Sequence, residues 1–225
     1  ENVLKGIRLF EPFSKEELGN ICKIGGPTAI QGMVYCMISM VLTRMVAAFG
    51  AEAIATQRVG GQIESVSWNT ADGFAAALNA FVGQNYGAKK MDRVQKGYRI
   101  SFWTVAIWGA LIMLAFIIFP GPIAGVFFHE EKAMEIAISY LIIIGFSEAF
   151  MCVELMTIGA LSGLGKTKLC SVISITATSM RIPLAMVLSR TSLGLDGIWW
   201  ALTLTSVAKG IIFYLTFRYQ MREKC

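Results

Sequence analysis

Long apolar runs separated by short charged segments dominate the chain. Residues 24–43 form a run of 20 without a charged side chain, and residues 100–128 form one of 29. Both runs predict transmembrane helices, because a helix needs about 20 mostly apolar residues to cross the ~30 Å hydrocarbon core of a bilayer. Four further segments qualify with embedded charges: 54–82, 137–162, 169–189 and 197–217.

Helix-breaking residues fall at the ends of these predicted spans. They are Pro120 and Pro122 in the third run, Gly163 and Gly165 after the fourth, and Gly194 and Gly197 before the sixth. Charge-free stretches of this length exclude a lipid-facing barrel, whose strands alternate over about ten residues. The pattern therefore predicts an all-α membrane protein with six transmembrane helices.

The basic residues predict how this bundle is oriented. Fourteen of the 20 Lys and Arg residues lie in segments on the N-terminal side, whereas the opposite loops hold only Lys132 and Arg190. Loops rich in Lys and Arg remain in the cytoplasm. With an even number of spans, both termini are expected to be cytoplasmic. We accordingly expect a multi-pass protein of the plasma (bacterial inner) membrane.

Composition supports the membrane interpretation. Apolar residues make up 55% of the 225 residues, charged residues only 16%, and the mean hydropathy is +0.60. An ordinary soluble domain has about 25% charged residues. The net charge of +5 is divided among separate clusters, which argues against nucleic acid as a partner. The sequence has one histidine, His129, and no Cys-x-x-Cys spacing. We therefore expect neither a metal site nor a catalytic residue set.

The segments outside the spans suggest the domain organisation. Residues 3–18 carry apolar side chains at helical spacing among charged neighbours. This pattern fits an amphipathic segment on the cytoplasmic interface, and it equally fits a plain linker. We assign 1–23 as an amphipathic linker, 24–218 as the transmembrane bundle and 219–225 as a cytoplasmic tail.

Polar side chains form a stripe along the second predicted span. At 100° per residue, the stripe falls within an arc of about 80°. Its members are Gln57, Glu64, Trp68, Asp72 and Asn79. Such a stripe avoids lipid, so it either lines a water-filled cavity or joins a polar network across the bundle. We include the neighbouring Asn69 among the expected cavity-lining residues.

Ionisable residues also lie in the later spans. Glu148 and Glu154 are six residues apart on the fourth span, hence about 120° apart around its axis. Both cannot face one narrow site, and the sequence does not indicate which one does. Carboxylates at membrane depth couple cation gradients to movement, since protonation or Na⁺ binding neutralises them. Arg181 and Lys209, on the fifth and sixth spans, are the expected counter-charges.

Five short motifs carry a family resemblance. They are Gly-Gly-Pro at 25–27, Phe-Val-Gly-Gln-Asn-Tyr-Gly-Ala at 81–88, Ser-Gly-Leu-Gly-Lys-Thr at 162–167, Arg-Ile-Pro-Leu-Ala at 181–185 and Gly-Leu-Asp-Gly-Ile-Trp at 194–199. In this order and spacing, they resemble the C-terminal lobe of multidrug and toxic compound extrusion (MATE) transporters. The resemblance extends over essentially the whole chain.

The resemblance implies an architecture and a function. Members have twelve helices in two six-helix lobes, hold substrate between the lobes and drive efflux by Na⁺ or H⁺ entry. Residues 1–23 would then be the inter-lobe linker, and the partner would be an N-terminal six-helix lobe. Expected substrates are small organic cations or amphipathic drugs, and no cofactor beyond the coupling ion is implied.

This sequence departs from the family at one expected coupling site. Some branches couple through an Asp in the N-terminal lobe, and others through carboxylates on the first and fourth helices of the C-terminal lobe. Here 24–46 contains no Asp or Glu. A cation site in this lobe therefore needs Glu64 or Asp72 from the second span, together with Glu148 and Glu154.

We therefore expect half of a secondary antiporter for amphipathic or cationic organic compounds. One alternative is a flippase of lipid-linked saccharides from the same wider superfamily, which would have a more basic cavity. A second is a non-transporting membrane scaffold. An intramembrane enzyme is disfavoured, because nucleophiles and bases that could form a catalytic set are missing from the sequence.

Overall fold

The computed structural model describes residues 14–222, and their regular structure is entirely helical. Its nine helices are α1 (Lys15–Ala47), α2 (Ala51–Gly87), α3 (Met91–Ile118), α4 (Pro120–Gly125), α5 (Glu131–Gly145), α6 (Glu148–Gly163), α7 (Thr167–Ser179), α8 (Arg181–Leu188) and α9 (Leu195–Arg222). The predicted all-α fold is confirmed.

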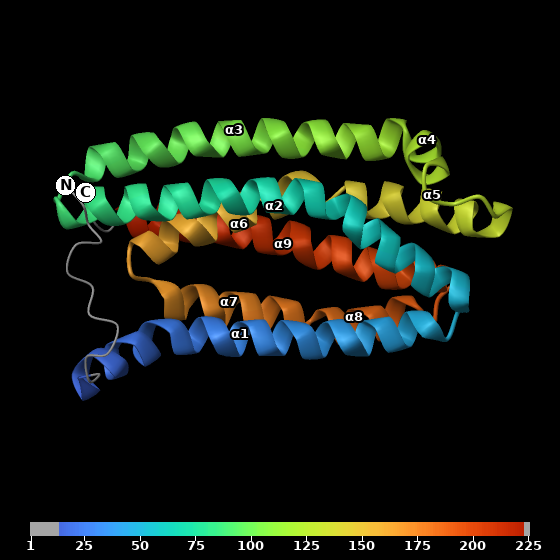
Figure 1. The fold of residues 1–225 in the computed structure, drawn as a ribbon, viewed down its shortest axis with the longest axis horizontal. Coiled ribbons are helices and arrows are strands. Elements are labelled where there is room, and N and C mark those ends of the chain that lie inside the picture. Colours follow the sequence, from blue (N-terminus) through green and yellow to red (C-terminus); the bar gives the residue numbers. More distant parts are fainter. Residues whose placement is uncertain (1–13, 223–225) are drawn as a thin grey trace.

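Within the described residues, the helices make six antiparallel passes along the long axis (Figure 1). The passes are α1, α2, α3, the α5–α6 pair, the α7–α8 pair and α9. Because α1 begins and α9 ends at the same end of the bundle, an even number of spans follows. Residues 1–13 and 223–225 lie outside the described part, so the linker and tail assignments stay predictions. Helix α1 itself begins at Lys15, within the predicted linker.

The six passes differ in apolar character. Four described segments are long and apolar enough to cross a bilayer: Gly25–Ala47, Met91–Ile118, Thr167–Leu188 and Leu195–Arg222. The α5–α6 pair passes the same test as one span bent by 50°. Helix α2 has 37 residues but is too polar to pass. Residues 54–82 nevertheless form one of the six passes, as predicted, and their polar side chains need protein or water beside them.

Breaks within the passes have local causes. Helix α3 ends at Ile118, earlier than the charge-free run to Phe128, because the residue before Pro120 avoids helical geometry. A proline lacks a backbone N–H, so Pro183 cannot bond the carbonyl four residues earlier. The break between α7 and α8 lies at Met180, three residues before that proline.

The bend between α5 and α6 frees backbone carbonyls inside the bundle. Ser147 Oγ donates to the carbonyl of Ile144 at 2.8 Å. Thr203 Oγ1 of α9 donates to the carbonyl of Ile143, also at 2.8 Å. The Ile144 carbonyl also accepts the backbone N–H of Ser147 at 2.9 Å. Since unpaired carbonyls are costly in a membrane interior, these hydrogen bonds stabilise the bend.

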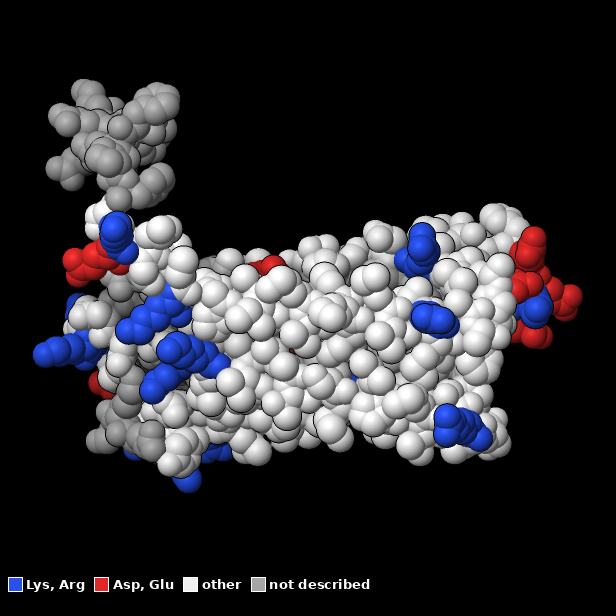
Figure 2. Space-filling model, turned by 90° about the horizontal axis from the view of Figure 1, so that it is seen from below, with Lys and Arg blue, Asp and Glu red and all other residues white. Residues whose placement is uncertain are grey.

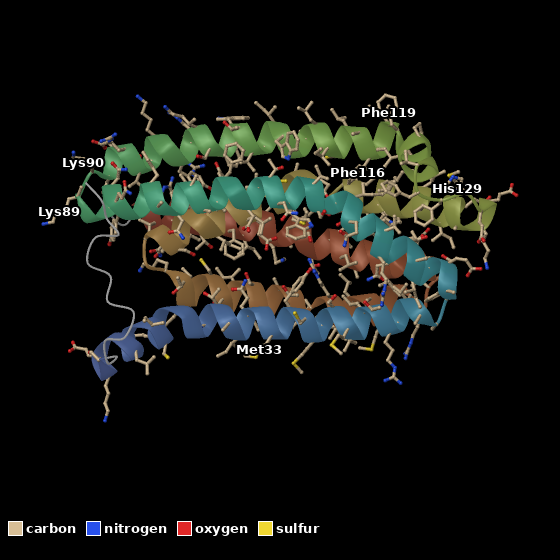
Figure 3. All side chains as sticks on the ribbon, viewed as in Figure 1. Met33, Lys89, Lys90, Phe116, Phe119 and His129 are labelled. Carbon is tan, nitrogen blue, oxygen red and sulfur yellow. The ribbon has the colours of Figure 1, made fainter. Side chains whose placement is uncertain are left out.

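Charge separates the two ends of the bundle. Lys and Arg gather at one end beside some Asp and Glu, the other end carries an acidic group together with further Lys and Arg, and the middle is almost uncharged (Figure 2). Lys89 and Lys90 lie at the end where α1 begins, and His129 lies at the opposite end (Figure 3). This distribution agrees with the orientation expected from the sequence, with the basic end in the cytoplasm.

Helix α6 is the centre of the bundle and packs against α2, α3 and α9. Glycines make the close approaches possible. A Cβ on Gly159 would collide with the backbone carbonyl of Ala75 in α2, and one on Gly163 would lie 2.6 Å from that of Asn79. This packing fixes the position of both α6 carboxylates relative to α2.

Candidate functional site

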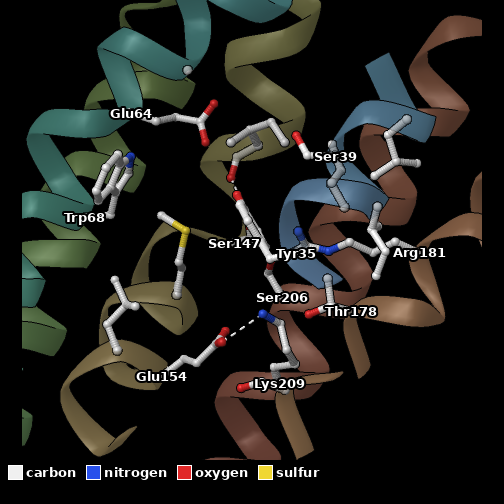
Figure 4. A pocket seen from close by; sticks show the side chains of 18 of the residues that line it. Tyr35, Ser39, Glu64, Trp68, Ser147, Glu154, Thr178, Arg181, Ser206 and Lys209 are labelled. Carbon is white, nitrogen blue, oxygen red and sulfur yellow. Dashed lines mark hydrogen bonds and ion pairs between the residues drawn. The ribbon is translucent and has the colours of Figure 1, made fainter. Parts of the chain in front are cut away.

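A pocket of about 1000 Å³ opens between α1 and α2 and reaches α6, α8 and α9. Most of its lining is apolar, and a few polar side chains converge on it (Figure 4). Helices α1 and α2 contribute Tyr35, Ser39, Gln57, Glu64 and Trp68. Tyr140 comes from α5, Ser147 from the bend between α5 and α6, and Glu154 from α6. Arg181 of α8 and Ser206 and Lys209 of α9 complete this set. An apolar pocket with a few convergent polar groups is typical of a small-molecule site.

On the α9 side of the pocket lies a buried ion pair. Lys209 Nζ donates to Glu154 Oε1 at 2.8 Å (Figure 4). The side chains are only 8% and 6% exposed. Lys209 thus has the carboxylate partner expected of a base at membrane depth, and Glu154 is the α6 carboxylate that faces the pocket.

Arg181 is held without a carboxylate. Its Nε donates to Thr205 Oγ1 at 3.1 Å and its Nη2 to Ser206 Oγ at 2.9 Å. Among the described residues, no acidic side chain forms an ion pair with it. The guanidinium is nevertheless buried and lines the pocket. Glu64, on the same pocket, is close enough to interact with this guanidinium electrostatically, so the role of Arg181 as a counter-charge stays a prediction.

Glu64 is fixed by a tyrosine on the facing helix. Tyr140 of α5 donates its hydroxyl hydrogen to Glu64 Oε1. The Tyr140 ring packs edge to face on Trp199, with centroids 5.0 Å apart. It also occupies the space that a Cβ on Gly60 would need. A glycine one turn before Glu64 therefore lets the tyrosine reach the carboxylate.

Glu148 lies behind Glu64 and Tyr140 and does not line the pocket. Its side chain is fully buried at the start of α6. Neither carboxylate oxygen has a hydrogen-bond partner among the described residues. The Ser67 hydroxyl of α2 is the polar group beside this carboxylate, and Glu64 and Tyr140 lie close enough to interact with it electrostatically. The two α6 carboxylates thus occupy different environments, as their angular separation requires.

The polar stripe of α2 divides in two. Gln57, Glu64 and Trp68 line the pocket. Asn69, Asp72 and Asn79 do not line it, and their side chains are exposed on the surface of the described lobe. The structure does not bring Asp72 together with the other predicted carboxylates. A cavity role for these three residues stays a prediction that needs another surface facing α2.

A comparison with protein-family models identifies the family of this helical bundle. The MatE model matches residues 27–187, which include parts of the first five of the six passes. The chain belongs to the MatE family. This is a transporter family, so the fold and the family together make this MatE chain a multi-pass protein of the inner membrane and part of a transporter.

Named relatives agree with this family. The MatE chain is 28% identical over 211 residues to the probable multidrug resistance protein NorM of Thermotoga maritima, covering 90% of this chain and 45% of that protein. It is 24% identical over 222 residues to the probable multidrug resistance protein YoeA of Bacillus subtilis, covering 98% and 48%. The chain therefore spans about half the length of the curated relatives it matches.

Solved structures share the fold. The Vibrio cholerae MATE transporter VcmN in its bent form superposes with a TM-score of 0.86 at 21% identity, over 94% of this chain and 48% of that one. A transporter of the MOP superfamily from Pyrococcus furiosus, for which a reversed polarity of the binding pocket is described, gives 0.86 at 21% identity over 97% and 50%. Again, about half of each solved chain corresponds to the MatE chain.

Several pocket residues of the MatE chain escape sequence reasoning. Tyr35 and Ser39 lie in a predicted span without any charge, and Tyr140 lies in an apolar run. Their signal is weak, because a single tyrosine or serine in a membrane helix is common. The Tyr140 and Glu64 partners are 76 residues apart, a pairing that no local pattern reveals.

Proposed function

We propose that this chain is one lobe of a secondary antiporter that exports amphipathic and cationic organic compounds in exchange for protons. Its partner would be an N-terminal six-helix lobe, and the substrate would lie between the two. The MatE family and relatives named as probable multidrug resistance proteins support this proposal. The observation that carries it is the pairing of a pocket-facing carboxylate, Glu64, with a second carboxylate, Glu148, buried directly behind it.

The pocket suits an amphipathic cation. Its apolar lining would bury the hydrocarbon part of a substrate. Trp68 offers an indole face, to which organic cations are attracted, and Glu64 lies one turn away on the same helix. Glu154 contributes less, because Lys209 already neutralises it.

Protons fit the coupling role better than Na⁺. An ionised carboxylate in a dry site without a partner is far more costly than a protonated one. Glu148 is therefore the carboxylate that we propose to exchange a proton during transport. Hard cations such as Na⁺ need several oxygen ligands around them, whereas the Glu148 oxygens have no described partner. Since Glu64 and Glu148 interact, a substrate cation at Glu64 and a proton at Glu148 influence each other's binding.

Efflux of a fluorescent organic cation from cells that express the full-length protein tests this proposal. Glu64→Gln and Glu148→Gln are expected to slow proton-driven efflux at least about tenfold, since coupling energies are typically 1–3 kcal/mol. Asp92→Asn is the matched control, an exposed carboxylate at the start of α3 outside the pocket, and is expected to retain efflux. Wild-type rates in both the Glu64 and the Glu148 variant would refute the proposal, as would efflux driven by a Na⁺ gradient alone.

One observation favours a second candidate function. Three basic side chains, Arg58, Arg181 and Lys209, line the pocket against two carboxylates. A basic cavity suits the phosphate groups of a lipid-linked saccharide. A flippase of this kind would export no organic cation, and lipid-linked precursors would accumulate when the protein is deleted. A membrane scaffold would show neither effect, and its pocket variants would all behave like the wild type.

A further inference from the structure

A second hollow, separate from the pocket, lies at the basic end of the bundle between α3 and α9. It has a volume of about 500 Å³. Its lining comes from the first turns of α3 and the last turns of α9: Gln95, Tyr98, Arg99, Phe102, Trp103, Tyr214, Phe217, Arg218, Met221 and Arg222. We call this the α3–α9 groove. None of the proposed transport residues belongs to it.

Aromatic packing forms a fixed floor for the α3–α9 groove. The rings of Tyr98 and Phe217 stack with centroids 3.6 Å apart and planes inclined by 15°. The Tyr98 hydroxyl is 2.9 Å from the Thr157 hydroxyl of α6. Both α3 and α9 pack against α6. The groove is therefore preformed by the core and does not depend on a mobile side chain.

Three arginines give the groove a strong positive charge. Arg99 lies on α3, and Arg218 and Arg222 lie one turn apart on α9. Arg218 is stacked over Tyr214, with its guanidinium carbon 5.9 Å from the ring centroid. Among residues 14–222, no acidic side chain lines the groove or forms an ion pair with these arginines. The groove therefore offers several unpaired donors to an anion.

An apolar track leads from the groove toward the middle of the membrane. Trp103, Ile107 and Leu111 succeed one another at intervals of four residues on α3, and they are 61%, 58% and 56% exposed. On α9, Leu215 is 56% exposed one turn before Tyr219. A soluble anion would make no use of such a track. An occupant with an anionic head and hydrocarbon chains matches both parts.

We propose that the α3–α9 groove binds one anionic phospholipid of the cytoplasmic leaflet, with its phosphate at Arg99 and Arg218 and its acyl chains along the exposed face of α3. Anionic lipids concentrate in that leaflet, and basic pockets between transmembrane helices on the cytoplasmic side bind their headgroups. This site is independent of the proposed antiport, because it shares no residue with the transport pocket.

Native mass spectrometry of the purified full-length protein, titrated with phosphatidylglycerol or phosphatidylcholine, tests the site. Phosphatidylglycerol is expected to bind more tightly. The double variant R99Q/R218Q should weaken phosphatidylglycerol binding by about 25-fold, from about 1 kcal/mol for each arginine near the membrane surface. Phosphatidylcholine binding should be unchanged. Both arginines are exposed, so the variant is expected to fold, which its helical circular dichroism will verify.

The matched control is R93Q/K96Q, which removes the same charge from the same end of α3 but changes no groove residue. It is expected to bind phosphatidylglycerol as the wild type does. Equal weakening in both double variants would show attraction by surface charge alone and would overturn the proposal. Equal wild-type affinity for the two lipids would also overturn it. So would displacement of the lipid by millimolar glycerol 3-phosphate, which would identify the occupant as a soluble anion.

Discussion

Glu148 and Glu154 lie six residues apart on one helix and are both almost fully buried, yet their environments are opposite. Glu154 pairs with Lys209 at 2.8 Å, whereas neither oxygen of Glu148 has a described partner. A paired carboxylate can stay ionised while it is buried, and removing it leaves the basic partner buried without a counter-charge. A carboxylate without a partner is neutral when buried and can change its charge if water reaches it. The second kind is the one proposed above to exchange a proton.

The neighbouring helices produce this difference. Helix α9 brings a lysine to one side of α6, and α2 brings small residues and a serine to the other, where Ser67 contacts Cys152 at 3.2 Å. The packing of α6 therefore assigns roles that the carboxylates themselves do not specify. Each of the following changes tests this assignment.

The largest effect is expected from Gly159→Leu. Its side chain would collide with the Ala75 carbonyl and separate α6 from α2, so both carboxylates would lose their places. Overpacking against backbone in a core costs more than about 3 kcal/mol, and we expect no monodisperse protein in detergent gel filtration. Gly73→Leu is the control, because a Cβ on Gly73 of α2 meets nothing within 4 Å. A well-behaved Gly159→Leu protein would contradict the close packing.

Glu154→Ala is expected to follow, with a loss of about 3–5 kcal/mol in the free energy of unfolding, because Lys209 would remain buried without a partner. Unfolding in a denaturing detergent measures this loss. The double variant Glu154→Ala with Lys209→Met should regain most of the stability, since it removes both charges. If the double variant is as unstable as the single one, the ion pair is not the reason for the loss.

Glu148→Leu is expected to change stability in the opposite direction. Replacing a buried polar group that has no partner by an apolar one of similar size is neutral or stabilising, by about 1 kcal/mol here. The same unfolding measurement applies. A loss of more than about 2 kcal/mol, typical of a broken buried hydrogen bond, would mean that Glu148 has a partner after all, and the comparison with Glu154 would fail.

The smallest effect is expected at an exposed pair of the same residue types, Glu52 and Lys132, which are 3.3 Å apart at the other end of the bundle. The backbone N–H at the start of α2 lowers the pKa of Glu52, and Lys132 lowers it further. A lowered folded-state pKa stabilises the fold above the ordinary Glu value of about 4.3, and this is lost as the pH falls through the lowered value.

Glu52→Gln should therefore be slightly less stable than the wild type at pH 7 and equally stable once Glu52 is protonated. Melting temperatures of both proteins at pH 7 and at successively lower pH, until the two proteins no longer differ, measure the effect. A loss at pH 7 as large as that in Glu154→Ala would remove the distinction between exposed and buried pairs.

The sequence predicts the membrane fold well, because apolar run length and Gly or Pro breaks are local properties. The break before Pro183 and the end of the third span near Pro120 follow from proline geometry alone. The bend before Glu148 was not predicted, since its support comes from Thr203 on a distant helix.

The candidate site is predicted only in part. Polar residues at membrane depth identify Glu64, Glu154 and Lys209, which the structure brings to one pocket. Asp72 shares the helical stripe of Glu64 but lies outside the pocket, because a stripe along a 37-residue helix extends beyond it. Arg181 donates to two hydroxyls and interacts with Glu64 without forming an ion pair with it. Which polar group meets which depends on tertiary packing.

The polarity of α2 also bears on how the chain enters the membrane during synthesis. Its neighbours α1 and α3 contain segments apolar enough to span a bilayer, whereas α2 is not. Asp and Arg near the centre of a lone helix oppose its insertion by several kcal/mol. The newly made α2 therefore depends on α1 and α3 to enter the bilayer. At least these three helices are expected to insert together.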